Sequence, residues 1–248
     1  MKFHVFGKQN GKTVMFIHGL GTTWDKSFSK VIALLQGDFH VIAAGLDGHD
    51  PEEKTNYISG EREAEQVERF IRDNLGGRID VIYGSSLGCV TALLTAYRRN
   101  VTVSNIILDG TVDTSLGILN KPVSKFAGWF GEQVLKGKMN WFLKLGGVTP
   151  EMLNELLYSG ISRTTLKNAF YDGASMFTYV NKMEPCNGVR LACWYGTNEK
   201  SAARGARKIR KAFPKGKDTI FEGFGHGEIL LHPEQFCKEL RRILNFGA

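Results

Sequence analysis

The chain of 248 residues is long enough for one domain with a substantial core, and 42% hydrophobic and 23% charged residues are typical of a soluble globular protein. No stretch reaches the roughly 20 apolar residues of a membrane span, and the first residues do not resemble a secretory signal. The net charge of +7 would suit a polyanion. However, the basic residues at 200–217 fall on a helical pattern without a recognition motif, so we expect a solvated helix face and no nucleic-acid partner.

Short apolar strands alternate with helical segments, which is the pattern of an α/β fold with a mostly parallel sheet flanked by helices. At the start, strands at 3–6 and 13–18 are joined across Gln9 to Lys12, and this spacing predicts a hairpin. The later elements expected in chain order are helix 28–35, strand 40–45, helix 59–75, strand 79–84, helix 87–99, strand 103–110, strand 190–196, helix 202–213, strand 218–223 and a helix from 233.

The pattern changes between residues 112 and 185, where four helical pieces follow one another without a convincing strand. These pieces are rich in Trp, Phe, Met and Leu, and Pro150 stands where the first turn of a helix tolerates proline. We therefore expect an all-helical cap at 112–185, inserted into an α/β core made of residues 1–111 and 186–248.

The stretch Gly84-Ser85-Ser86-Leu87-Gly88 follows a β-branched strand and precedes a helix. This context favours a nucleophile elbow, a sharp strand-to-helix turn with a serine at its apex. Ser86 is then the nucleophile, Gly84 and Gly88 avoid clashes in the turn, and the N–H of Leu87 can face an oxyanion. An ordinary Gly-Ser turn without a catalytic part is the alternative.

A second glycine-containing turn, His18-Gly19-Leu20-Gly21, follows the strand at 13–18. It can present the N–H of Leu20 to the same oxyanion. A phosphate-binding loop is the alternative, but the GxxxxGK[ST] spacing is missing. We expect His18 to hold the loop rather than to carry a proton.

His226 lies in a glycine-rich loop between the last strand and the last helix. Histidine is the side chain best suited to take a proton from a serine hydroxyl near neutral pH. It is therefore the candidate base for Ser86, and a surface loop histidine is the alternative.

A carboxylate is needed to orient that imidazole and to stabilise its cation. Glu199 follows strand 190–196 and is our first choice. Asp109 is the main competitor, with Asp113 after it, because both follow the preceding strand. Glu199 has its own alternative explanation as an acidic residue favoured at a helix N-terminus.

With these positions assembled, the sequence resembles the α/β-hydrolase fold superfamily over nearly its whole length. Four ordered segments carry the resemblance: IHGLG for the oxyanion segment, GSSLG for the nucleophile elbow, YGTNE for the acid loop and GFGHGE for the histidine loop. The insertion at 112–185 then corresponds to the family's helical cap. Two departures stand out. Gly45 and Asp50 replace the usual first Asp and last Gly of the family's Asp-x-Pro-Gly-His-Gly loop, and Glu199 replaces the commoner Asp.

The resemblance implies a serine hydrolase, of the carboxylesterase or lipase kind, that cleaves an ester or related acyl bond of a small molecule. An acyltransferase, a C–C hydrolase and an aminopeptidase use the same site, and a non-catalytic receptor is a further alternative. Cap aromatic residues are candidates for an apolar pocket over the serine, although packing within the cap explains them equally. These pocket candidates are Trp129, Phe130, Trp141 and Phe177.

The remaining expectations concern cofactors and location. The cysteines at 89, 186, 193 and 237 match neither a zinc site nor a compact disulfide framework. We therefore expect reduced thiols, a cytoplasmic location, and neither a metal nor another cofactor.

Overall fold

The computed structural model describes residues 1–113, 115–138 and 154–245. The strands are β1 (Lys2–Gly7), β2 (Thr13–Ile17), β3 (His40–Gly45), β4 (Arg78–Ser85), β5 (Thr102–Asp109), β6 (Arg190–Gly196) and β7 (Lys217–Phe221). The described helices are α1 (Trp24–Leu35), α2 (Gly60–Asn74), α3 (Gly88–Arg98), α4 (Asn120–Leu135), α7 (Arg163–Val180), α8 (Lys200–Ala212) and α9 (Pro233–Asn245), with the short 3₁₀ helices η1 (Gly117–Leu119) and η2 (Glu228–Leu231).

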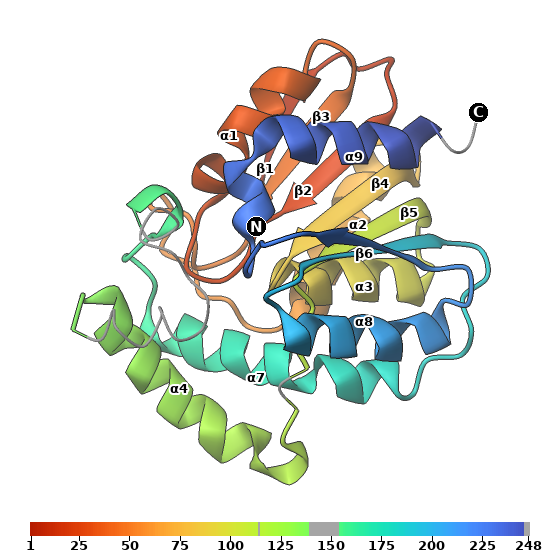
Figure 1. The fold of residues 1–248 in the computed structure, drawn as a ribbon. Helices are drawn as coiled ribbons and strands as arrows, with labels where there is room; N and C mark the ends of the chain where they lie inside the picture. Colours follow the sequence, from red (N-terminus) through yellow and green to blue (C-terminus); the bar gives the residue numbers. More distant parts are fainter. Residues whose placement is uncertain (114, 139–153, 246–248) are drawn as a thin grey trace.

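One sheet runs through the centre of the molecule in the strand order β1-β3-β2-β4-β5-β6-β7. Only β1 is antiparallel to its neighbour, and the other pairs are parallel. Apolar side chains of α1 and α9 cover one face, and those of α2, α3 and α8 cover the other (Figure 1). The predicted α/β fold class is therefore confirmed.

The predicted hairpin between the first two strands is wrong. β3 lies between them, with Phe3 of β1 opposite Ala44 and Thr13 of β2 opposite His40. The physical reason is burial: four of the five residues of β2 are buried, which requires a strand on each side, whereas β1 is partly exposed and suits the sheet edge. The intervening turn residues indicate a change of direction but do not specify the neighbour.

Between β5 and β6 the described residues form helices and irregular segments, with no strand among them. α7 packs against α3 and α8, and α4 packs against α7 on the outside of the molecule (Figure 1). The predicted helical piece at 139–147 and the start of the next one, at 149–153, lie outside the described residues. The limits 112 and 185 of the cap stay a prediction. No helix in the described ranges has the length and apolar content needed to cross a membrane.

Asp172 fastens α7 to the start of α2. Its buried carboxylate accepts the backbone N–H of Gly60 and, at 3.1 Å, the hydroxyl of Tyr57. Asn168 adds a 2.9 Å hydrogen bond to the carbonyl of Tyr57. A carboxylate at a helix N-terminus satisfies a donor that the helix cannot satisfy itself. Burial nevertheless raises the pKa of Asp172 to about 6.

We expect Asp172→Ala to lower the free energy of unfolding by about 2–4 kcal/mol, because two buried donors lose their acceptor. Urea denaturation at a pH well above the raised pKa measures this change. Asp73→Ala, at an exposed position of α2, is the control and should change little. Equal effects of the two substitutions would contradict the anchoring role.

Candidate active site

Ser86 occupies the sharp turn between β4 and α3. Its φ of +49° lies in the left-handed region, which is costly for a residue with a side chain. Two backbone hydrogen bonds hold the turn: Ser86 N–H donates to the carbonyl of Asp109 at 2.8 Å, and Cys89 N–H donates to the carbonyl of Ser86 at 3.0 Å. A strained serine fixed in this way is the geometry expected of a nucleophile elbow.

The two glycines of the motif are required by close backbone approaches. A Cβ on Gly84 would lie 2.4 Å from the carbonyl oxygen of Gly88. A Cβ on Gly88 would lie 2.3 Å from the carbonyl oxygen of Ile17 in β2. Since no side chain fits at either position, the spacing of the motif follows from how β2, β4 and α3 pack.

His226 lies in the loop after β7 and contacts both other members of the predicted triad. Its Nε2 is 3.0 Å from Ser86 Oγ, and its Nδ1 is 2.7 Å from Glu199 Oε1. The second oxygen of Glu199 accepts the N–H of Gly196 at 2.8 Å. Because Nδ1 faces a carboxylate, it carries the proton in the neutral ring, which leaves Nε2 free to accept the serine hydroxyl.

The surroundings of His226 favour its protonated form. Burial lowers the pKa of the imidazole, but the hydrogen bond and charge of Glu199, together with the charge of Asp109, outweigh burial and raise the pKa above 6.5. Glu199 is only 7% exposed, so water screens its charge little.

Asp109, the alternative acid, points elsewhere. Its carboxylate is buried at the end of β5 and accepts the hydroxyl of Tyr83 at 2.6 Å. Burial raises the pKa of this carboxyl to about 7. Asp113 forms an ion pair with Lys208 at 2.6 Å. The structure thus brings Glu199, and neither aspartate, into hydrogen-bond contact with the imidazole.

The backbone of the two predicted oxyanion donors converges on the serine. A Cβ on Gly19 would lie 3.2 Å from the Cβ of Ser86, so the turn that contains Leu20 lies directly against the nucleophile elbow. Leu87 is the N-cap of α3. Within the described part of the chain, neither Leu20 nor Leu87 has an acceptor for its N–H. Both donors are therefore free to bind a ligand oxygen.

His18 holds the turn that contains Leu20, which is the structural role expected from its position in the sequence. Its Nδ1–H donates to the carbonyl of Gly19 at 2.8 Å, and its Nε2 accepts the N–H of Leu46 at 3.1 Å. Complete burial lowers the pKa of His18 to about 3, so the ring stays neutral and keeps both contacts.

The predicted pocket residues differ in their exposure, and the apolar pocket stays a prediction. Trp129 is 39% exposed on α4. Phe177 is 1% exposed and packs in the core, with the Lys208 ammonium 5.5 Å from the centroid of its ring. Phe130 is half-buried beside Phe126, with ring centroids 6.2 Å apart. Apolar periodicity identifies a helix but does not specify how deeply each aromatic residue of that helix is buried. Trp141 lies outside the described residues.

Two further contacts at this site involve residues that no pattern in the sequence indicates. The N–H of Tyr158 donates to the carbonyl of Gly21 at 2.8 Å, and a Cβ on Gly21 would lie 3.9 Å from Leu157. This segment between β5 and β6 therefore borders the turn that carries Leu20. Its position depends on tertiary packing, which no local motif encodes.

Gly110 is a second such residue. Its φ is +69°, and a Cβ there would lie 2.7 Å from Cε1 and 2.9 Å from Nδ1 of His226. The imidazole therefore rests directly on the backbone of Gly110. In the sequence, a glycine after a strand indicates only a turn. Its contact with the imidazole cannot be read there, because His226 lies in a loop more than a hundred residues later in the chain.

No group of three or more His, Cys, Asp or Glu side chains suited to a metal ion occurs among the residues that the structure describes. At the serine itself, a hydroxyl lies within hydrogen-bond distance of an imidazole, which is the pairing that nucleophilic catalysis by serine requires.

Comparison with known proteins identifies the family of the chain and agrees with its fold. The model of the alpha/beta hydrolase family matches residues 14–239. An alpha/beta hydrolase family protein from Desulfitobacterium hafniense superposes with a TM-score of 0.86 at 24% identity, over 98% of this chain and 100% of that one. MenH from S. aureus gives 0.74 at 18% identity, over 98% and 97%. A thermophilic esterase from Thermogutta terrifontis gives 0.77 at 17% identity, over 98% and 92%.

We expect Gly110→Ala to slow the reaction of Ser86 with a fluorophosphonate about 10²-fold, because the new methyl group displaces His226. Gly117→Ala is a matched control: Gly117 has a φ of +61°, and a Cβ there meets nothing within 4 Å. Both variants carry similar backbone strain, so only the contact with the imidazole differs. Equal labelling rates would show that the ring does not depend on this contact.

Proposed function

The chain belongs to the alpha/beta hydrolase family, and on this basis we propose that it is a serine hydrolase of the carboxylesterase or lipase kind, which cleaves a carboxylic ester of a small molecule. The observation that carries the proposal is the hydrogen-bonded row from Ser86 Oγ through His226 to Glu199. Esterases among the structurally similar proteins support the same reaction class.

In the first step His226 Nε2 takes the proton of Ser86 as Oγ attacks the ester carbonyl. The carbonyl oxygen becomes an oxyanion, which accepts the N–H groups of Leu20 and Leu87. The protonated imidazole then gives its proton to the leaving alcohol. The products of this step are the free alcohol and an acyl group bound to Ser86.

In the second step a water molecule replaces the alcohol. The oxygen of the water attacks the acyl carbonyl while His226 accepts one proton of the water. The imidazolium then gives this proton to Ser86 Oγ as the acid leaves. Glu199 stabilises the imidazolium in both steps. Its hydrogen bond from Gly196 fixes the carboxylate, so little reorganisation is needed when the charge appears.

The surroundings of this site extend the proposal. We assign residues 112–185, which contain η1, α4 and α7, to a cap, and the contact of Tyr158 with Gly21 supports a place for this segment beside the acyl group.

All four cysteines are buried free thiols, which supports a reducing compartment such as the cytoplasm.

We expect Ser86→Ala to lower kcat for p-nitrophenyl esters by at least about 10⁴-fold and to abolish fluorophosphonate labelling. Ser85→Ala is the control, because this neighbouring serine lies at the end of β4 and not against the imidazole. Turnover of esters but not of matched amides by the wild type would separate an esterase from an aminopeptidase. Labelling that persists in Ser86→Ala would contradict the assignment, and tight ligand binding without any turnover would favour a receptor.

Glu199→Gln and Asp109→Asn separate the two carboxylates. We expect Glu199→Gln to lower kcat about 10²- to 10⁴-fold, because the imidazolium loses its counter-charge, and Asp109→Asn to lower it about tenfold at most. The base must be neutral, so kcat/KM falls as the pH decreases through the pKa of His226. Without Glu199 this pKa decreases, and the acidic limb moves to lower pH. A larger loss in Asp109→Asn than in Glu199→Gln would assign the acid to Asp109.

A further inference from the structure

Helix α4 has its small residues on the side that packs and its large apolar residues on the side that faces solvent. Its buried residues include Asn120, Ser124, Gly128 and Gly131. A Cβ on Gly128 would lie 2.9–3.0 Å from Lys167 of α7, including its backbone, and one on Gly131 would lie 3.1 Å from Phe170. The approach of α7 therefore leaves little room for a side chain at positions 128 and 131 of α4.

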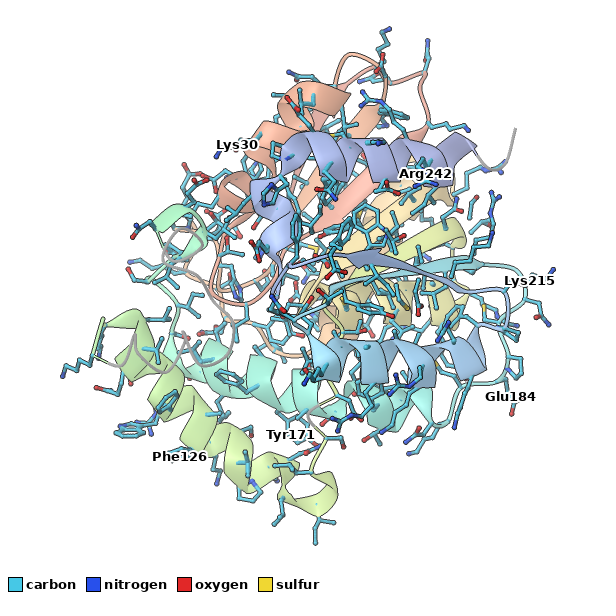
Figure 2. All side chains as sticks on the ribbon, in the orientation of Figure 1. Lys30, Phe126, Tyr171, Glu184, Lys215 and Arg242 are labelled. Atoms are coloured by element: carbon cyan, nitrogen blue, oxygen red, sulfur yellow. The ribbon has the colours of Figure 1, made fainter. Side chains whose placement is uncertain are left out.

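The opposite side of α4 and the preceding η1 carry an exposed cluster, which we call the outer apolar face. Six of the eleven exposed large apolar side chains among the described residues lie between positions 116 and 129. They are Leu116 (52% exposed), Ile118 (95%), Leu119 (54%), Val123 (42%), Phe126 (63%) and Trp129 (39%). Figure 2 shows Phe126 projecting away from the body of the protein.

This arrangement is a continuous face rather than a scatter of single residues. Leu119, Val123 and Phe126 follow one another at the spacing of one helix side, and the rings of Phe126 and Trp129 are 5.7 Å apart. The remaining exposed apolar residues, for example Leu34 and Ile220, lie on separate elements. Exposed apolar clusters of this kind usually mark an interaction site.

The charge beside the outer apolar face restricts what covers it. Residues 115–131 contain no Asp or Glu, whereas Lys121 and Lys125 are both exposed on α4. The next carboxylate of α4, that of Glu132, pairs with Lys136 at 2.8 Å. A second copy of the same face would therefore bring lysines of both copies together without an unpaired carboxylate from α4 to compensate. Lysines next to Trp, Phe and Leu on one helix are typical of helices that lie in the interface of an anionic membrane.

We propose that the η1–α4 segment binds the surface of an anionic phospholipid bilayer. The outer apolar face enters the boundary between headgroups and acyl chains, with Phe126 and Ile118 inserted furthest because they are the most exposed. Lys121 and Lys125 remain at the level of the lipid phosphates. This interaction does not depend on hydrolysis at Ser86.

Co-sedimentation of the full chain with lipid vesicles tests the proposal, with Ser86→Ala as background so that the outcome is independent of any esterase activity. We expect binding to vesicles of equal parts phosphatidylcholine and phosphatidylglycerol, weaker binding to phosphatidylcholine alone, and weakening by salt. No binding to either composition, or equal binding to both, would overturn the proposal.

Paired substitutions locate the surface. Ile118→Ser with Phe126→Ser should weaken binding at least about tenfold, because two inserted apolar side chains are lost. Leu34→Ser with Ile220→Ser, at exposed apolar positions on α1 and β7, is the matched control and should leave binding unchanged. Equal weakening in both pairs would overturn the assignment to α4.

The lysines are tested in the same way. Lys121→Gln with Lys125→Gln should weaken binding about 25-fold, since each basic residue near an anionic surface contributes about fivefold. Lys8→Gln with Lys26→Gln removes the same charge from exposed positions elsewhere and should have little effect. If sedimentation equilibrium without lipid instead finds a dimer that Ile118→Ser with Phe126→Ser dissociates, the occupant of the face is a second copy and the proposal is wrong.

Discussion

The hydrogen bond between Ser86 Oγ and His226 Nε2, 3.0 Å long, joins residues that are 140 positions apart in the chain. It forms because the parallel strands end together: in the sheet register Ser85 lies opposite Asp109, Asp109 opposite Trp194, and Gly196 opposite Phe221. The loops that follow these strands meet at one edge, which is where parallel sheets place their sites. The chemistry of the site depends on this alignment.

Close backbone contacts maintain the alignment. Ser86, in its left-handed backbone conformation, donates its N–H to the carbonyl of Asp109, and the carboxylate of Asp109 accepts the hydroxyl of Tyr83 in β4. Strand β5 therefore supports the elbow through both its main chain and a side chain. Gly110 and Gly196 bring the histidine loop within reach, since a Cβ on Gly196 would lie 1.9 Å from the carbonyl oxygen of Phe224. The strain at Ser86 is tolerated because the surrounding packing leaves the turn no alternative.

Local sequence patterns predicted much of this structure, and tertiary contacts account for what they missed. The sequence suggests Ser86, His226 and Glu199 as site residues because each follows a strand with a recognisable pattern, and such loops gather at one edge of a parallel sheet. The structure brings these three side chains into hydrogen-bond contact. The order of β1, β2 and β3 was not predicted, since turn residues do not specify a neighbour. The role of Gly110 and the outward position of Trp129 depend on close approaches between distant segments, so no spacing in the sequence reveals them.

The most direct test of the account is mass spectrometry of the protein, quenched by acid during turnover of an activated ester. Transfer through the Ser86 hydroxyl requires a covalent intermediate. The account predicts that one acyl group is added per chain, on the peptide that contains Ser86. An acyl group on another residue, or hydrolysis with no acylated protein even under conditions that make deacylation slow, would contradict it.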